Sequence, residues 1–175
     1  MQLRGRTVVV GIFVLAILMA GGAWWRRLQE SRHAAAYWGE QGAPLVVGNT
    51  KMEFLVLGDA AAQDQSGGSI AGRPIAQVFD LSEQRGVVHL RYALTQDANF
   101  EWNNMRDEPL DADREWAYAL RFSDDARQLA VLLSSDLATL GKVDADAGQV
   151  KVIPCPHLAT KLKRYLTDVK APLAP

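Results

Sequence analysis

The sequence predicts an α+β protein with an N-terminal single transmembrane helix followed by one domain, an antiparallel β-meander packed by about two helices. Three observations support this prediction. Residues 7–25 (TVVVGIFVLAILMAGGAWW) contain no ionisable side chain. The final third alternates short apolar segments with turn residues, which is typical of a meander. Near the carboxyl end, apolar residues recur at the spacing of an amphipathic helix.

The apolar run at residues 7–25 has the length of a membrane span. Its 19 residues cover about 28 Å as a helix, close to the ~30 Å of a bilayer core. Trp24 and Trp25 suit an interfacial aromatic belt, and Arg26 and Arg27 follow directly. A cleaved signal sequence is the alternative, because small residues at 21–23 resemble a cleavage site, but the length of the run favours retention. We therefore expect a membrane anchor that contacts lipid through residues 7–25.

The orientation of such an anchor follows from the short tail before it. Basic residues lie on both sides of the apolar run, at Arg4 and Arg6 and again from Arg26 to Arg32, so their count does not decide the topology. A short tail usually stays inside while the following domain is exported. We expect a single-pass protein of a bacterial-type cytoplasmic (inner) membrane, with its globular domain on the exported side.

Length and charge bound the remaining possibilities. The chain of 175 residues is long enough for one ordinary core beyond the anchor and too short for two. After Trp25 there are 17 basic and 20 acidic residues, a formal charge of −3. A nucleic-acid partner is not expected, because such partners require a clustered basic surface. Cys155 is the only cysteine, so no intramolecular disulfide can form.

The division of the chain follows from its helix formers and breakers. Residues 1–25 are the tail and anchor, and 26–50 form a juxtamembrane helical stalk and linker, because good helix formers run to Trp38 and glycines and a proline follow. Residues 51–175 form the globular domain. In it, 52–57 and 74–81 are predicted strands, separated by a Gly- and Ser-rich loop at 58–73.

The segment from Arg85 to Phe100 fits both a strand and a helix. Val88, Leu90 and Tyr92 alternate with other residues as in a strand, yet 87–98 also places apolar residues on one helical face. Its length and the few β-branched residues after Ala93 favour a helix. The acid-rich segment 101–115 that follows is predicted to be a solvated loop.

The final third gives the clearest pattern. Strands are predicted at 116–122, 129–133, 137–143 and 149–153, joined by short turns at 123–127 and 144–148. After Pro156, apolar residues from Leu158 to Val169 share one face of a predicted helix, which we expect to close over the sheet.

Candidate chemical groups are few, and no catalytic, cofactor-binding or metal site is predicted. The candidates weighed were His33, His89, the Cys155-Pro156-His157 triplet and two acidic segments. The acids of the first segment are Glu101, Asp107, Glu108, Asp111, Asp113 and Glu115, and those of the second are Asp144 and Asp146. Neither segment has the ligand order of a helix-loop-helix calcium site. A lone histidine or cysteine is more often structural than functional.

These observations favour a non-enzymatic interaction or assembly module with a protein partner. One alternative is a membrane-bound hydrolase that uses carboxylates of 101–115 with His89 or His157. Another is a small-ligand or lipid-binding domain with a cavity between sheet and helices. A hydrolase should bring a histidine to two of those acids, whereas an interaction module should expose an apolar patch.

Overall fold

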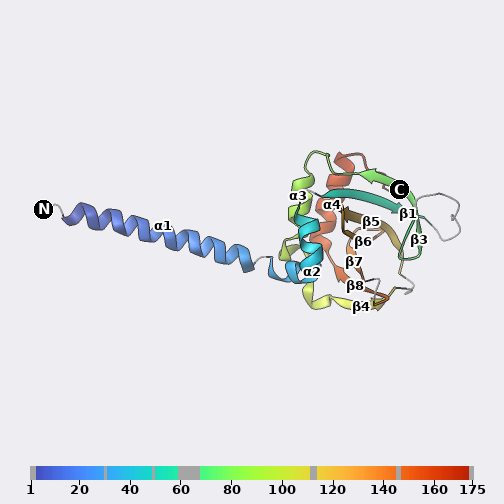
Figure 1. The fold of residues 1–175 in the computed structure, drawn as a ribbon, viewed down its shortest axis with the longest axis horizontal. Coiled ribbons are helices and arrows are strands. Elements are labelled where there is room, and N and C mark those ends of the chain that lie inside the picture. Colours follow the sequence, from blue (N-terminus) through green and yellow to red (C-terminus); the bar gives the residue numbers. More distant parts are fainter. Residues whose placement is uncertain are drawn as a thin grey trace.

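The computed structural model describes residues 3–29, 31–48, 50–58, 68–110, 114–144 and 147–173. It confirms the α+β class and the antiparallel sheet. Eight strands curl into a half-barrel, and three helices gather on the side of the sheet nearer the long N-terminal helix (Figure 1). About two packed helices were expected, so the helical layer is larger than the sequence indicated.

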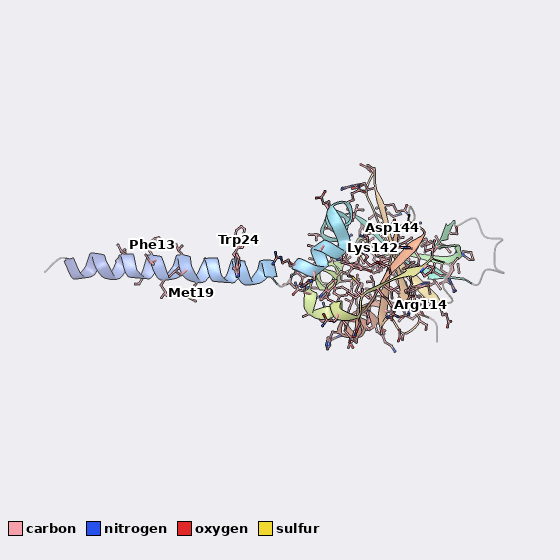
Figure 2. The ribbon with its side chains drawn as sticks, turned by 90° about the horizontal axis from the view of Figure 1, so that it is seen from below. Phe13, Met19, Trp24, Arg114, Lys142 and Asp144 are labelled. Carbon is pink, nitrogen blue, oxygen red and sulfur yellow. The ribbon has the colours of Figure 1, made fainter. Side chains whose placement is uncertain are left out.

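Helix α1 (Leu3–Gln29) projects away from the rest of the protein, and Phe13, Met19 and Trp24 point outward from it (Figure 2). Among the residues that the structure describes, no helix is long and apolar enough to cross a membrane.

The predicted transmembrane anchor at 7–25, with its single-pass and signal-anchor description, is therefore wrong for the described part of the chain. Contact of residues 7–25 with lipid and a location at a cytoplasmic membrane stay predictions.

Within the described residues, the sheet contains eight strands in the order β2-β3-β1-β5-β6-β7-β8-β4, with every neighbouring pair antiparallel. The strands are β1 (Lys51–Leu57), β2 (Ser69–Ile70), β3 (Arg73–Asp80), β4 (Arg106–Pro109), β5 (Trp116–Ser123), β6 (Gln128–Ser134), β7 (Thr139–Asp144) and β8 (Gln149–Pro154). The meander β5 to β8 and the strands near 52–57 and 74–81 are as predicted. Two short strands, β2 and β4, replace parts of the predicted loops at 58–73 and 101–115, of which residues 59–67 and 111–113 lie outside the described part.

A bulge in β5 divides its aromatic residues between two faces. The sequence alternation places Trp116 with Tyr118, Leu120 and Phe122, but the register to β6 shifts between Trp116 and Tyr118. Such a shift turns a side chain to the other face. Trp116 therefore packs with Ala119 in a smaller cluster, while Tyr118, Leu120 and Phe122 join the main core under the helices.

Helix α2 (Arg32–Val47) supplies much of that main core. Trp38, Leu45 and Val46 are at most 2% exposed, although the sequence placed 26–50 in a stalk and linker outside the globular domain. The backbone at Gly39 is not helical, with a φ of 72° and a ψ of 175°, so the axis kinks there, and helical turns resume after it.

Contacts at its start and at its kink hold α2 to the domain. At its start, Asp97 of the short helix η1 (Asp97–Asn99) accepts the backbone N–H groups of His33 and Ala34 at 3.0 and 2.7 Å. At the kink, the Lys142 ammonium donates to the carbonyls of Tyr37 and Trp38 at 2.8 and 3.2 Å. An acid at the helix start and a cation near freed carbonyls both complement the helix dipole. Burial lowers the pKa of Lys142.

Helices α3 (Val87–Leu94) and α4 (Pro156–Asp168) complete the layer. The segment 85–100 is thus helical over 87–94, as preferred, and a second short helix, η2 (Trp102–Asn104), follows it. On α4 the predicted stripe is confirmed, because Leu158, Leu162 and Leu166 are fully buried. The space between sheet and helices is occupied by these and other buried side chains.

Candidate binding surface around helix α3

The short helix α3 has one buried face and one exposed face. Leu90, Ala93 and Leu94 are buried against α2, α4 and the sheet, whereas Val88 is 71% exposed. Gly86 begins the helix at a φ of 88°, where a side chain would lie 3.4 Å from the Tyr165 ring. Glycine at this position therefore lets the chain turn sharply and brings α3 close to α4.

Arg91 is the one charged residue that α3 buries within the described chain, at 6% exposure. Its guanidinium donates to the carbonyls of Leu45 and Val46 at 3.0 Å and of Thr50 at 2.6 Å, and it lies 5.5 Å from the centre of the Phe122 ring. Burial lowers the pKa of Arg91. The carbonyl oxygens at the end of α2 thus stabilise this cation without a carboxylate.

A groove of about 820 Å³ lies between α3 and α4, and we call it the basic groove. Its charged lining residues and its one histidine are Arg85, His89, Lys161, Arg164, Asp168 and Lys170. Four permanent cations therefore face a single carboxylate. This excess contrasts with the formal charge of −3 from residue 26 onward.

The cations of the basic groove lack acidic partners within the described residues. No described carboxylate forms an ion pair with Arg85, Lys161, Arg164 or Lys170; Lys161 donates only to the Asn99 amide oxygen, at 2.7 Å. Several arginines elsewhere in the described chain pair with carboxylates. Arg127, for example, pairs with Asp124 at 2.6 Å. The basic groove thus concentrates positive charge that the described fold does not neutralise.

Tyr165 forms part of the wall of the basic groove. Its hydroxyl oxygen is buried and has no hydrogen-bond partner among the described residues. Burial raises the pKa of Tyr165, while the nearby Arg91 cation acts in the opposite direction. Because most buried hydroxyls in proteins are hydrogen-bonded, this residue is unusual.

A second groove, of about 340 Å³, lies on the other side of α3, toward the end of α2, and we call it the apolar groove. Val47, Val88 and Tyr92 line it and are 64%, 71% and 51% exposed. The guanidinium of Arg91, which also lines this groove, already donates to the carbonyls of Leu45 and Thr50. The accessible part of this groove is therefore mainly hydrocarbon.

The predicted hydrolase residues do not converge. His89 lines the basic groove, where Asp168 is the acid present. His157 is exposed in the first turn of α4. Of the acids in 101–115, Glu108 pairs with Arg106 and Arg114, Asp107 lies 3.9 Å from Lys151, and Glu101 accepts from Asn104. Asp111 and Asp113 lie outside the described residues.

The other candidate groups have structural surroundings. His33 stacks on Trp102 with ring centres 5.6 Å apart. Cys155 is buried, its thiol lies 3.7 Å from the Leu137 carbonyl oxygen, and burial raises its pKa to about 12. Asp144 accepts the backbone N–H of Ala147 in the turn before β8; Asp146 lies outside the described residues. Within the described part of the chain, no group of three or more His, Cys, Asp or Glu could hold a metal ion.

Sequence reasoning did not identify the basic groove as a candidate site. Arg85 and His89 are separated by more than 70 positions from Lys161 and Arg164, so only the packing of α3 on α4 brings them together. A partial signal exists on α4, where Lys161 and Arg164 lie one turn apart on the flank of the apolar stripe.

Comparisons with known proteins identify no relative from which a function could be transferred: no family model matches the chain, and neither a curated protein nor a solved structure shows significant similarity to it.

Proposed function

We propose that this protein is a non-enzymatic interaction module that binds an acidic segment of a partner protein in the basic groove. The observation behind the proposal is the set of cations at Arg85, Lys161, Arg164 and Lys170, which have no acidic partner within the described chain. Complementary charge across an interface speeds association and selects the partner.

The arrangement of these cations favours an extended chain over a compact anion. On α4, Lys161 and Arg164 lie one turn apart, a rise of about 4.5 Å, and Lys170 follows the end of the helix. Arg85 and His89 lie on the opposite wall. Charges spread along a groove match successive carboxylates of a peptide, which repeat every ~3.3 Å in an extended chain.

A nucleic acid would fit the rest of the molecule poorly. The segment after residue 25 carries a formal charge of −3, although the groove itself holds four lysine or arginine residues and one aspartate. The surface outside the groove is therefore acidic, and it would repel a long polyanion. A short acidic peptide contacts the groove alone and avoids most of this repulsion.

The test measures binding of a fluorescent twelve-residue peptide of alternating glutamate and serine to the full chain, in a mild non-ionic detergent that covers the apolar surface of α1. We expect binding that weakens between about 0.05 and 0.5 M salt, because screening shortens the reach of exposed charges. The double variant Arg85→Gln, Arg164→Gln should bind about tenfold more weakly, at roughly 0.7 kcal/mol for each charge.

The matched control is Lys163→Gln, which removes one cation from α4 outside the groove and should leave the affinity within about twofold. Equal weakening by Lys163→Gln and by Arg164→Gln alone would show a general charge effect and contradict the proposal. Tighter binding of a single-stranded DNA of equal charge would also overturn it, since it would assign the groove to nucleic acid.

A further inference from the structure

The apolar groove holds a concentration of exposed hydrocarbon that the proposed binding of an acidic segment does not use. Outside α1, the large apolar side chains that are exposed in the described chain are Val47, Val78, Val88, Tyr92 and Met105. Three of them, Val47, Val88 and Tyr92, line this one groove. Clustered apolar exposure is a mark of binding surfaces, whereas single exposed residues are ordinary.

The apolar groove and the basic groove are separated only by α3. His89 faces the basic groove, and the preceding residue, Val88, lines the apolar groove. Successive residues of a helix point about 100° apart, and a helix with its side chains is roughly 10 Å wide. An extended peptide covers that width with about three residues. One bound segment can therefore reach both grooves.

The chemistry of the apolar groove selects an apolar side chain. Two nitrogens of Arg91 donate to carbonyl oxygens of α2 and Thr50, and the Thr95 hydroxyl donates to the Tyr92 carbonyl at 2.8 Å. These donors are already used within the fold, so a polar side chain would lose water without a matching hydrogen bond. Hydrocarbon would gain from the contact instead.

We infer that the apolar groove is the specificity pocket of the same binding surface: it takes one aliphatic or aromatic side chain that lies about three residues beyond the acidic part of the partner segment. The inference rests on the proposed binding of that segment in the basic groove. The combined surface has an apolar pocket beside a charged rim, an arrangement common at protein interfaces.

The experiment compares two fluorescent peptides on the full chain in the same detergent buffer. Both carry the glutamate-serine repeat, followed after three serines by either leucine or serine at the anchor position. We expect the leucine peptide to bind wild-type protein about fivefold more tightly, because part of one leucine side chain is buried. Placing the leucine directly after the last glutamate should remove most of the gain.

The double variant Val88→Ser, Tyr92→Ser should bind both peptides with the affinity that wild-type protein shows for the serine peptide. The matched control is Val78→Ser on β3, another exposed valine, at 51%, which should keep the fivefold preference. Circular dichroism checks that the variants remain folded. This comparison forms a thermodynamic cycle that isolates the contribution of the anchor side chain.

The outcomes separate the two proposals. If both acidic peptides bind equally to wild-type protein, the apolar groove is not a specificity pocket, and the proposed function stands. If the leucine preference persists in the Val88→Ser, Tyr92→Ser variant, the side chain binds elsewhere and the inference is overturned. If neither peptide binds, the proposed function itself fails.

Discussion

The cations of the sheet and those of the basic groove differ in whether carboxylates pair with them. On the sheet and its turns, carboxylates accept from most of the described arginines. Glu108 binds Arg106 and Arg114, Glu53 binds Arg121 together with Lys51, and Asp124 binds Arg127. In the basic groove, Arg85, Arg164 and Lys170 have no such partner among the described residues. Charge therefore stabilises the sheet, but it does not stabilise the surface between α3 and α4.

This difference follows from where each group lies. Neighbouring strands hold their side chains at fixed spacing, so a carboxylate between two cations forms a pair at little entropic cost. The cations of the basic groove repel one another across two helices and would favour separation. A surface that keeps unpaired charge at some cost to stability is typical of a site retained for binding.

Replacing the buried cation Arg91 by methionine should have the largest effect on stability. The substitution leaves the carbonyls of Leu45, Val46 and Thr50 without their donor in a buried place. Hydrogen bonds to charged groups contribute about 1.5 to 3 kcal/mol each, so we expect a loss of at least about 3 kcal/mol. Urea unfolding of the full chain measures it. A loss below about 1 kcal/mol would show that Arg91 does not hold the end of α2.

Truncating Leu162 tests whether the inner face of α4 is fixed while its outer face is free. Leu162 is fully buried, and Leu→Ala changes at such sites typically cost about 2 to 5 kcal/mol. Lys163→Ala, at the next and exposed position, should change stability by at most about 0.5 kcal/mol. Thermal unfolding of the two variants gives the comparison. Equal shifts of the midpoints would mean that α4 is not docked in solution.

Local patterns predicted the parts of the fold in which each residue is fixed by near neighbours. The strands of the meander and the stripe on α4 belong here, because their periods of 2 and 3.6 are visible in a few residues. Helix α2 was assigned to a stalk for the opposite reason. Its start is capped by Asp97, which is 63 residues from Ala34, and no window of sequence contains such a contact.

The candidate site was not predictable for a related reason. A solvated cation and a cation in a binding groove have the same sequence pattern, and only the tertiary contact between α3 and α4 distinguishes them. The bulge beside Trp116 is a further case, because a single extra residue moves this aromatic side chain to the other face. The apolar run of α1 is a case in which composition alone favoured a membrane span, and the described residues contain no helix that qualifies as one.

The pair of Glu53 with Arg121 makes part of the stability depend on pH. Glu53 is 4% exposed; burial alone would raise its pKa, but hydrogen bonds from Arg121 and Lys51 outweigh burial and hold the pKa below its ordinary value. A lowered folded-state pKa gives stability that is present above the unfolded value of ~4.3 and is lost as pH falls through the folded value.

Glu53→Gln should therefore lose about 1 to 2 kcal/mol at neutral pH, and the gap to wild type should shrink below about pH 4. Urea unfolding at a series of pH values between about 3 and 7 measures the gap. A gap that stays constant over this range would mean that ionised Glu53 contributes no more to stability than protonated Glu53.

A direct comparison of one paired and one unpaired arginine sharpens the contrast between sheet and groove. Arg114 donates to both carboxylate oxygens of Glu108, at 3.0 and 2.8 Å, and Arg114→Gln should cost about 1 kcal/mol. Arg164→Gln should leave stability unchanged within about 0.5 kcal/mol, or raise it, because it reduces repulsion in the basic groove. Equal losses in thermal unfolding would place Arg164 in a structural role instead.

The smallest expected effect concerns Tyr165, at the boundary between the basic groove and the core. Its hydroxyl is buried without a hydrogen-bond partner among the described residues. Removing a buried polar group that makes no hydrogen bond relieves its desolvation cost, and the phenylalanine ring keeps the contact with Gly86. Tyr165→Phe should thus be neutral or stabilising by up to about 1 kcal/mol, with unchanged affinity for the acidic peptide. A loss of about 1 kcal/mol or more would show that the hydroxyl is hydrogen-bonded in solution. Weaker peptide binding at unchanged stability would instead show that Tyr165 contacts the peptide. Tyr165 would then belong to the binding surface of the basic groove and not to the core.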